Sequence, residues 1–261
     1  MLDLQTIEPA LTGTIFSGKL HHALITDSTN SDAVSGGRQG APHGSVWLAE
    51  EQSAGRGRGD HRWYSTAGEG LYVSILLRPN LPPARLLLLP LAAGLAAAEA
   101  IRATTDLPVD IRWPNDLLIG PRKTGGILLE STGNFAVIGI GINVHQRSFP
   151  EGLDTPATAL DTEAARYISR QALLVALLHA IERESTTLAD PVTASQIPLR
   201  VAQASTWING RRVDVHGPQA CTGTTAGLDE YGFLRVQTST GLITVQTGGI
   251  RAPAPASSTM E

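Results

Sequence analysis

The sequence predicts an α+β fold in which helices flank a mixed sheet and a small all-β domain follows. Up to about residue 206, short apolar runs typical of strands alternate with two Ala- and Leu-rich stretches of helical character. From Asn209 to Ile250, short Val, Leu and Ile runs alternate with glycine-containing turns instead. Hydrophobic residues make up 42% of the 261 residues, which is enough for a sizeable core.

The elements are expected in a definite order. Before Thr26 we expect one extended or strand segment, and the capping residues from Asp27 to Asn30 then open a short helix ending near Ser35. Further strands are expected at 46–50, 71–77, 109–113, 116–119, 126–131 and 135–144, and helices at 86–104 and 169–184. A boundary near residue 206 gives a large domain (1–206), a small domain (207–252) and a disordered tail (253–261).

Composition excludes several classes of protein. The formal net charge of −4 argues against an electrostatic hold on nucleic acid, which needs a basic face. The single cysteine, Cys221, excludes an internal disulfide and a Cys-rich zinc site, and it fits a reducing cytosol. The opening residues lack the pattern of a secretory signal, and the apolar run 86–98 falls short of the roughly 20 residues that span a membrane.

A basic, glycine-rich loop stands out in this mildly acidic chain. The stretch GRGRGDHR, residues 55–62, lies between two predicted strands. Glycine lets backbone N–H groups approach an anion, and arginine offers a planar fork that matches carboxylate or phosphate. The alternatives are a solvated surface loop, a chance Arg-Gly-Asp adhesion tripeptide and an RNA-binding Arg-Gly repeat. We favour a site for a small anionic ligand.

Three further motifs follow the loop. They are RWPND (112–116), KTGGILLE (123–130) and GIGINV (139–144). Glycines weaken a strand, so those in the last two motifs indicate that a ligand or another backbone passes close by. GIGINV is not a dinucleotide-binding fingerprint, because it lacks the third glycine and no helix follows directly.

Taken together and in this order, the motifs resemble those of the biotin protein ligases. The resemblance runs from Thr26 to Arg251, since GLDEYGFLRV and TGGIR near the end also match. It implies a catalytic domain like that of the class II aminoacyl-tRNA synthetases and an SH3-like C-terminal domain. It also implies the reaction: biotin and MgATP form biotinyl-5′-AMP, and biotin then passes to a lysine of a biotin carboxyl carrier domain.

The resemblance assigns roles to individual residues. It implies that Lys123, Arg56 and Arg58 are catalytic, with Lys123 touching the biotin carboxylate and the α-phosphate. Biotin would be bound by Ser28, Thr29, Asn30, Gln52, Arg56, Gly57, Arg58, Lys123, Gly126 and Gly141. ATP would be bound by Arg58, Trp63, Asn115, Asp116, Lys123 and Asn143, with Asp116 as the candidate magnesium ligand. Ser28 and Thr29 also suit helix capping, and Trp113 suits core packing at least as well as ligand contact.

The chain departs from the family pattern at two places. Gly59-Asp60-His61 stands where many bacterial members continue with Arg-Gly-Arg, and Arg112 stands where lysine is usual. We assign no phosphate-binding role to His61. Because the adenylate must be shielded from water, we expect residues 55–62 to be mobile in the free protein and to fold over biotinyl-AMP.

Two other functions remain alternatives to the biotin ligase. One is a lipoate or octanoate ligase of the same fold, and the other is a non-catalytic protein that binds biotin or a nucleotide. The STN motif begins at Ser28, so we expect no N-terminal DNA-binding domain, no DNA partner and a monofunctional ligase. We also expect a cytoplasmic protein without a membrane partner. The sequence does not identify the carrier protein, and a homodimer is an open alternative.

Overall fold

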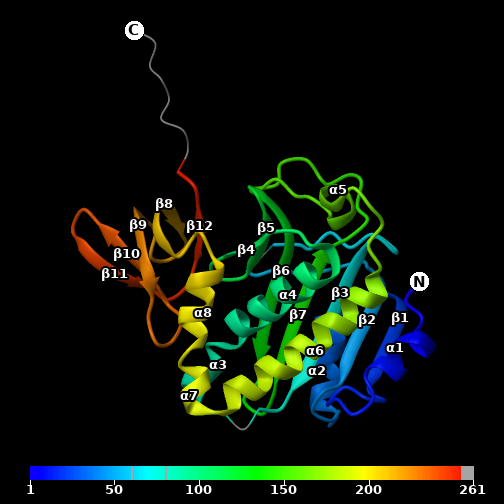
Figure 1. Ribbon diagram of the computed structural model, residues 1–261. Helices are drawn as coiled ribbons and strands as arrows, with labels where there is room; N and C mark the ends of the chain where they lie inside the picture. The colour runs from blue at the N-terminus through cyan, green and yellow to red at the C-terminus, as the bar shows by residue number, and fades with distance from the viewer. Residues whose placement is uncertain (60, 80, 254–261) are drawn as a thin grey trace.

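The computed structural model describes residues 1–59, 61–79 and 81–253, which form a large mixed sheet covered by helices and a smaller antiparallel sheet (Figure 1). Within these residues the large sheet has seven strands in the order β1-β2-β3-β7-β6-β5-β4. Strands β1 and β2 pair in parallel, and the other neighbours are antiparallel. The strands are β1 (Leu20–Thr26), β2 (Val46–Gln52), β3 (Gly70–Leu77), β4 (Val109–Arg112), β5 (Asp116–Ile119), β6 (Arg122–Ser131) and β7 (Ala136–Asn143). This confirms the predicted mixed sheet.

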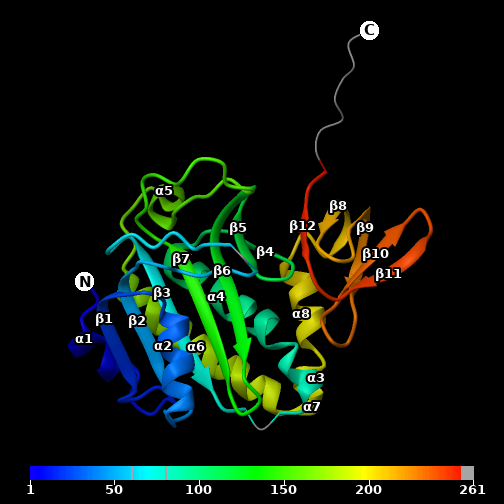
Figure 2. The same ribbon diagram turned by 180° about the vertical axis from the view of Figure 1, so that it is seen from behind.

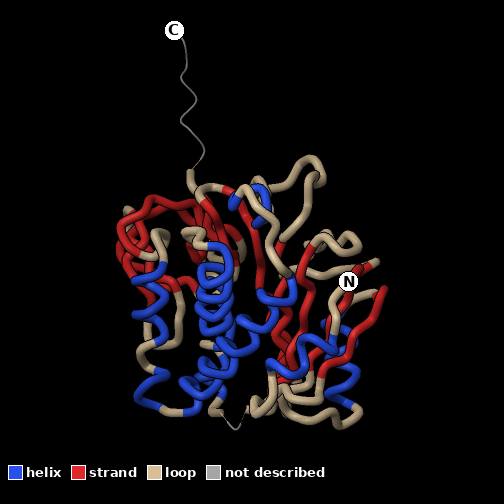
Figure 3. The backbone as a smooth tube through the Cα atoms, turned by 45° about the vertical axis from the view of Figure 1, so that its right-hand side comes forward, coloured by secondary structure: helices blue, strands red, loops and turns tan. Residues whose placement is uncertain are grey.

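Helices cover both faces of the large sheet. The two long helices, α4 (Leu89–Thr105) and α6 (Arg170–Ala189), lie on one face (Figure 1), and α2 (Thr29–Arg38) lies on the other (Figure 2). The remaining described helices are α1 (Leu4–Ala10), α3 (Pro83–Leu86), α5 (Leu160–Ala164), α7 (Pro191–Ala194) and α8 (Ile197–Ala204). Figure 3 shows how strands and helices separate into layers.

The core lies between the sheet and the pair α4 and α6. Every residue of β3 is buried, in agreement with its continuous apolar sequence. The small side chains Ala96, Ala97 and Ala98 are fully buried in α4, so the helix packs closely against its neighbours. The Ser169 hydroxyl accepts a hydrogen bond from the N–H of Ala172 and caps α6 as predicted.

One apolar helical stretch is longer than the sequence indicates. Pro83–Thr105 is the one helix of the described chain whose length and composition would allow it to cross a membrane. Two-thirds (67%) of its most apolar 18-residue window is buried inside the protein, where α4 packs on the sheet. This stretch is therefore a core helix, and its apolar character serves burial.

The structure corrects several expectations about local structure. The segment before Thr26 contains helix α1 as well as β1, and the Asp3 carboxylate caps α1 by accepting a hydrogen bond from the N–H of Gln5 at 3.0 Å. Helices α5, α7 and α8 were not predicted either. All four are short, from four to eight residues, and a periodic pattern cannot develop over so few positions. Strand β6 begins at Arg122, four residues earlier than predicted, so Lys123 lies within it.

The small sheet follows α8. Within the described residues it has five antiparallel strands in the order β11-β10-β9-β8-β12. They are β8 (Asn209–His216), β9 (Cys221–Leu228), β10 (Leu234–Thr238), β11 (Gly241–Val245) and β12 (Gly249–Arg251). The boundary near 206 and the SH3-like assignment stay predictions. Residues 254–261 of the predicted tail lie outside the described residues.

Candidate functional site

The predicted site residues line one cleft of about 1590 Å³. The start of α2, the basic loop, the strands β5 to β7 and the segment 149–157 form most of its wall. Residues 216–218, at the end of β8, and 247–251, which include β12, complete it. The cleft therefore spans both sheets.

Two glycines form part of the cleft floor, and an indole lies over them. A methyl group added at Gly141 would come within 2.4 Å of the Trp63 ring, and one added at Gly126 would come within 3.0 Å. Gly126 and Gly141 pair directly across β6 and β7, so the two positions make one flat patch. In this structure the Trp63 ring occupies the space over both glycines, and their role in making room for biotin stays a prediction. The Trp63 Nε1 is buried without a hydrogen-bond partner among the described residues.

A carboxylate with two cations lies at another part of the cleft. The Lys123 Nζ is 2.5 Å from Asp116 Oδ1, and an Arg112 Nη2 is 2.6 Å from Asp116 Oδ2. Burial alone would raise the pKa of Asp116, but Lys123 and Arg112 outweigh it and hold that pKa below its usual value. Arg112 also donates to the Thr155 hydroxyl at 2.9 Å. The guanidinium fork thus makes two contacts that an ammonium would make less readily.

The predicted ureido-binding residues lie at the start of α2 and at the end of β2. The Gln52 Oε1 accepts from the N–H of Thr29 at 2.9 Å and from its hydroxyl at 3.1 Å, and the Gln52 amide donates to Ser65 at 2.8 Å. Ser28 is the N-cap residue, yet its side chain makes no capping hydrogen bond within the described chain. The sequence left capping open for both Ser28 and Thr29. Ser28 is one of the residues that line the cleft.

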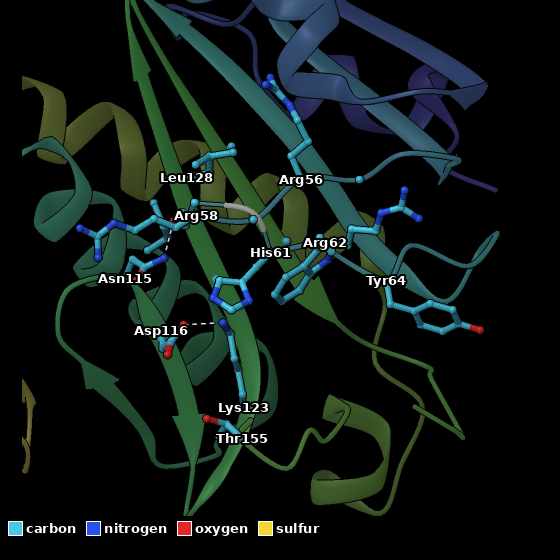
Figure 4. Close-up of a pocket in the computed structure, with 18 of the residues that line it drawn as sticks. Arg56, Arg58, His61, Arg62, Tyr64, Asn115, Asp116, Lys123, Leu128 and Thr155 are labelled. Atoms are coloured by element: carbon cyan, nitrogen blue, oxygen red, sulfur yellow. Dashed lines mark hydrogen bonds and ion pairs between the residues drawn. The ribbon is translucent and has the colours of Figure 1, made fainter. Parts of the chain in front are cut away.

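The two arginines of the loop point to different places. Arg56 Nη2 is 2.7 Å from Glu130 Oε2, and Figure 4 shows the Arg56 side chain directed away from Lys123 and Asp116. Arg58 reaches the small sheet, where its guanidinium donates to the carbonyl of Gly248 and to the hydroxyl of Thr247. Burial lowers the pKa of Arg58, and the nearby Asp116 carboxylate opposes that shift.

The two predicted asparagines make backbone contacts. Asn115 donates to the carbonyl of Ile127 at 2.8 Å, and this bond ties the start of β5 to β6. Asn143 is buried and donates to the carbonyl of Thr158 at 3.1 Å. Trp113 is buried and donates to the carbonyl of Gly232 at 3.0 Å, which favours the core-packing interpretation. All three residues also line the cleft.

The structure thus brings Lys123, Asp116 and Arg112 together and holds Arg56 apart from them. It adds partners that the sequence motifs did not single out, namely Glu130, Thr155, Thr247 and Gly248. Glu130 is the last residue of KTGGILLE, and Thr247 and Gly248 are the first two of TGGIR. Their places in these motifs could have marked them as candidate site residues, although the motifs gave them no role. Asp60, part of the departure from the family pattern, lies outside the described residues, and Figure 4 shows the His61 ring on the Lys123 side of the loop.

Comparison with known proteins agrees with the motifs. Residues 23–146 match the Biotin/lipoate A/B protein ligase family. The chain is 32% identical over 233 residues to the biotin--[acetyl-CoA-carboxylase] ligase of Mycobacterium tuberculosis, covering 86% of this chain and 85% of that protein. The chain belongs to the biotin protein ligase family.

Other members of this family are similar over most of the chain. The bifunctional ligase/repressor BirA of Bacillus spizizenii is 32% identical over 237 residues, which cover 87% of this chain and 71% of that protein. A structure of the biotin protein ligase from Aquifex aeolicus in complex with biotin and ATP superimposes with a TM-score of 0.80 at 29% identity, covering 90% of this chain and 98% of that one. These relatives confirm the resemblance read from the motifs, and the segment 23–146 contains every predicted ligand-binding residue.

Proposed function

We propose that the protein is an ATP-dependent biotin ligase, which converts biotin to biotinyl-5′-AMP and transfers biotin to a lysine of a biotin carboxyl carrier domain. In the first step the biotin carboxylate attacks the α-phosphate of ATP, and pyrophosphate leaves. In the second step the acceptor amine attacks the biotinyl carbonyl, and AMP leaves. Both steps concentrate negative charge, which cations and N–H donors fixed in a cleft stabilise.

The observation that carries the proposal is that the Lys123 ammonium lies in the same cleft as the motif residues predicted to bind biotin. Its side chain is 28% exposed, and its Nζ lies 5.5 Å from the centre of the Trp63 ring that covers the glycine floor. A biotin carboxylate placed beyond that floor would therefore meet Lys123. We assign Lys123 and Arg58 to the carboxylate and α-phosphate, and Arg56 to the biotin tail and carboxylate, over which the basic loop would close.

The same proposal assigns the two ends of biotin and the nucleotide. The hydroxyls of Ser28 and Thr29, with Gln52, would hold the ureido group, because all three lie at one end of the cleft with polar atoms close together. Biotin would bind over Gly126 and Gly141 and displace the Trp63 indole, which could then lie beside adenine. Asn30 and Gly57 would contact biotin, and Asn115 and Asn143 would contact the nucleotide, since each lines the cleft.

Magnesium belongs to the ATP co-substrate in this proposal. The described residues contain no group of three or more His, Cys, Asp or Glu side chains that could hold a metal ion. Both oxygens of Asp116 are already bound by cations, so its surroundings do not fit a magnesium ligand. No step is therefore assigned to a protein-bound ion, and magnesium would enter on the nucleotide phosphates.

The proposal also covers the acceptor protein and the cellular compartment. The acceptor would be a biotin carboxyl carrier domain of a carboxylase, in line with the name of the mycobacterial relative. The reaction would take place in the cytoplasm, where the single reduced cysteine is stable. A homodimer and the absence of a DNA partner stay predictions.

Pyrophosphate release tests the function. The protein is incubated with MgATP and with biotin, lipoate or octanoate in turn, and release is expected with biotin alone. Lys123→Ala should abolish release and leave biotin binding measurable, whereas Arg235→Ala, at an exposed position of β10, should behave like the unchanged protein. Release driven by lipoate or octanoate would support the rival ligase. Binding of biotin with no release from the unchanged protein would support a non-catalytic binder.

A further inference from the structure

Glu130 connects two distant parts of the chain through one carboxylate oxygen. Its Oε2 accepts from the Arg56 guanidinium of the basic loop at 2.7 Å and from the Asn30 amide of α2 at 2.7 Å. These partners lie 74 and 100 residues away in sequence. The side chains of Glu130 and Arg56 are 29% and 43% exposed, so this ion pair is partly open to solvent, and Arg56 lines the cleft.

Asn30 carries the connection to the predicted ureido-binding residues. The Ser74 hydroxyl lies 2.6 Å from Asn30 Oδ1 and 2.8 Å from the Thr29 hydroxyl. The Thr29 hydroxyl in turn donates to Gln52. Asn30 can lie flat across β7 because Gly139 has no side chain there, and a methyl group at Gly139 would come within 2.1 Å of Asn30 Oδ1.

The same series of contacts returns to the base of the loop. Gln52 donates to the Ser65 hydroxyl, which lies 3.2 Å from the carbonyl of Trp63. The N–H of Trp63 donates to the carbonyl of Gly55 at 2.9 Å, so the two ends of the loop are joined just before Arg56. One end of the loop is therefore held through Ser65 and Gln52, and the other end is held by Glu130.

We propose that Glu130 is a positioning residue for biotin binding: it holds the basic loop over the cleft through Arg56 and orients Asn30 behind the ureido-binding residues. The carboxylate suits this role because it only accepts hydrogen bonds, and both partners are donors. Arg56 acts as the anchor of the loop on the α2 side, and Arg58 acts as the anchor on the small sheet. The inferred effect on biotin binding, the biotin arm, rests on the proposed function. The inferred holding of the basic loop, the loop arm, rests on the contacts alone.

The loop arm is tested by limited proteolysis of the full-length protein with trypsin. The loop offers arginines at 56, 58 and 62, and the fragments identify which bond is cut. Glu130→Gln keeps an oxygen that can accept from Asn30 but removes the charge that binds Arg56. Loop cleavage should become about two- to fivefold faster, as expected for loss of a partly exposed ion pair. High salt should shrink the difference, because it weakens the pair in the unchanged protein.

The biotin arm is tested by steady-state kinetics of the same variant. The KM for biotin should rise by about two- to fivefold, while kcat and the KM for ATP change little, because the chemical groups stay in place. Glu99→Gln is the matched control: Glu99 also pairs with an arginine, Arg183, but lies outside the cleft on α4. It should leave both loop cleavage and the biotin KM unchanged.

Two results would overturn the inference. One is a Glu130→Gln variant whose loop cleavage and biotin KM equal those of the Glu99→Gln control. The other is faster cleavage at bonds throughout the chain together with a lower melting temperature, which would mark Glu130 as a general structural residue. If the unchanged protein showed no ligase activity, the proposed function would fail, and the proteolysis would still decide whether Glu130 anchors the loop.

Discussion

At the scale of single residues, the balance of charge around Asp116 organises the reactive end of the cleft. The Asp116 carboxylate pairs with both Lys123 and Arg112 in the free protein, so neither cation is buried without a partner and the cluster keeps one net positive charge. An incoming carboxylate or phosphate can then share these cations. The site can be both stable when empty and attractive to anions.

The charge balance predicts how stability depends on pH. The pKa of Asp116 is lower in the folded protein, so its ionised form favours folding above the ordinary carboxyl pKa of about 4, and this contribution is lost as the pH falls further. Asp116→Asn should lower the free energy of unfolding at pH 7 and make it less dependent on pH below about 4. Urea titrations from pH 7 to pH 2 measure both effects.

A matched variant gives the control for that titration. Asp106→Asn changes a carboxylate that is 96% exposed, at a left-handed position that asparagine tolerates. Its unfolding free energy should follow the unchanged protein at every pH. Equal curves for the Asp116 and Asp106 variants would contradict the account of the Asp116 ion pairs.

At the scale of elements, the sequence predicts the two long helices and the strands of the large sheet, including the short β4 and β5, and misses most of the short helices. The continuous apolar run of β3 and the Ala- and Leu-rich α4 are buried along their length, so burial leaves a clear pattern in both. Helix α1, with one buried residue, leaves almost none. Short helices are held mainly by caps and neighbouring chain, which a periodic pattern does not record.

The candidate site follows the same division. The residues that the motifs single out as ligand-binding all line the cleft. The motifs do not predict the partners, since Arg56 meets Glu130 across 74 residues and Arg58 meets Thr247 across 189. Nor do they predict that the indole of Trp63 lies on the glycine floor. Such contacts depend on how the loop packs in three dimensions, and the loop sequence alone suits several arrangements.

The glycine floor of β6 and β7 gives a prediction of its own. Gly141→Ala places a methyl group where the Trp63 ring now lies and where biotin is proposed to bind. The fold should tolerate the change, because Gly141 has an ordinary strand conformation, but the KM for biotin should rise about tenfold through overpacking. Gly94→Ala, where the nearest atom would be 3.6 Å from the added carbon, serves as control. Unchanged biotin kinetics for Gly141→Ala would mean that biotin does not use this floor.

At the scale of the whole molecule, the two sheets share the cleft and the core. Arg58 bonds Thr247 and Gly248, and Trp113 bonds the carbonyl of Gly232 in a turn of the small sheet. The buried hydrophobic cluster also runs without a break from the large sheet into the small one. The small sheet therefore helps to shape the site, and the predicted boundary near residue 206 separates elements that work together.

The central claim is that the protein attaches biotin to a carrier lysine, and intact-mass measurement of the carrier tests it most directly. A purified biotin carboxyl carrier domain is incubated with the protein, MgATP and biotin, alongside a carrier whose acceptor lysine is replaced by arginine. The account predicts a mass increase of one biotinyl group on the first carrier and none on the second or without ATP. A carrier that keeps its original mass in the presence of biotin and MgATP would contradict it.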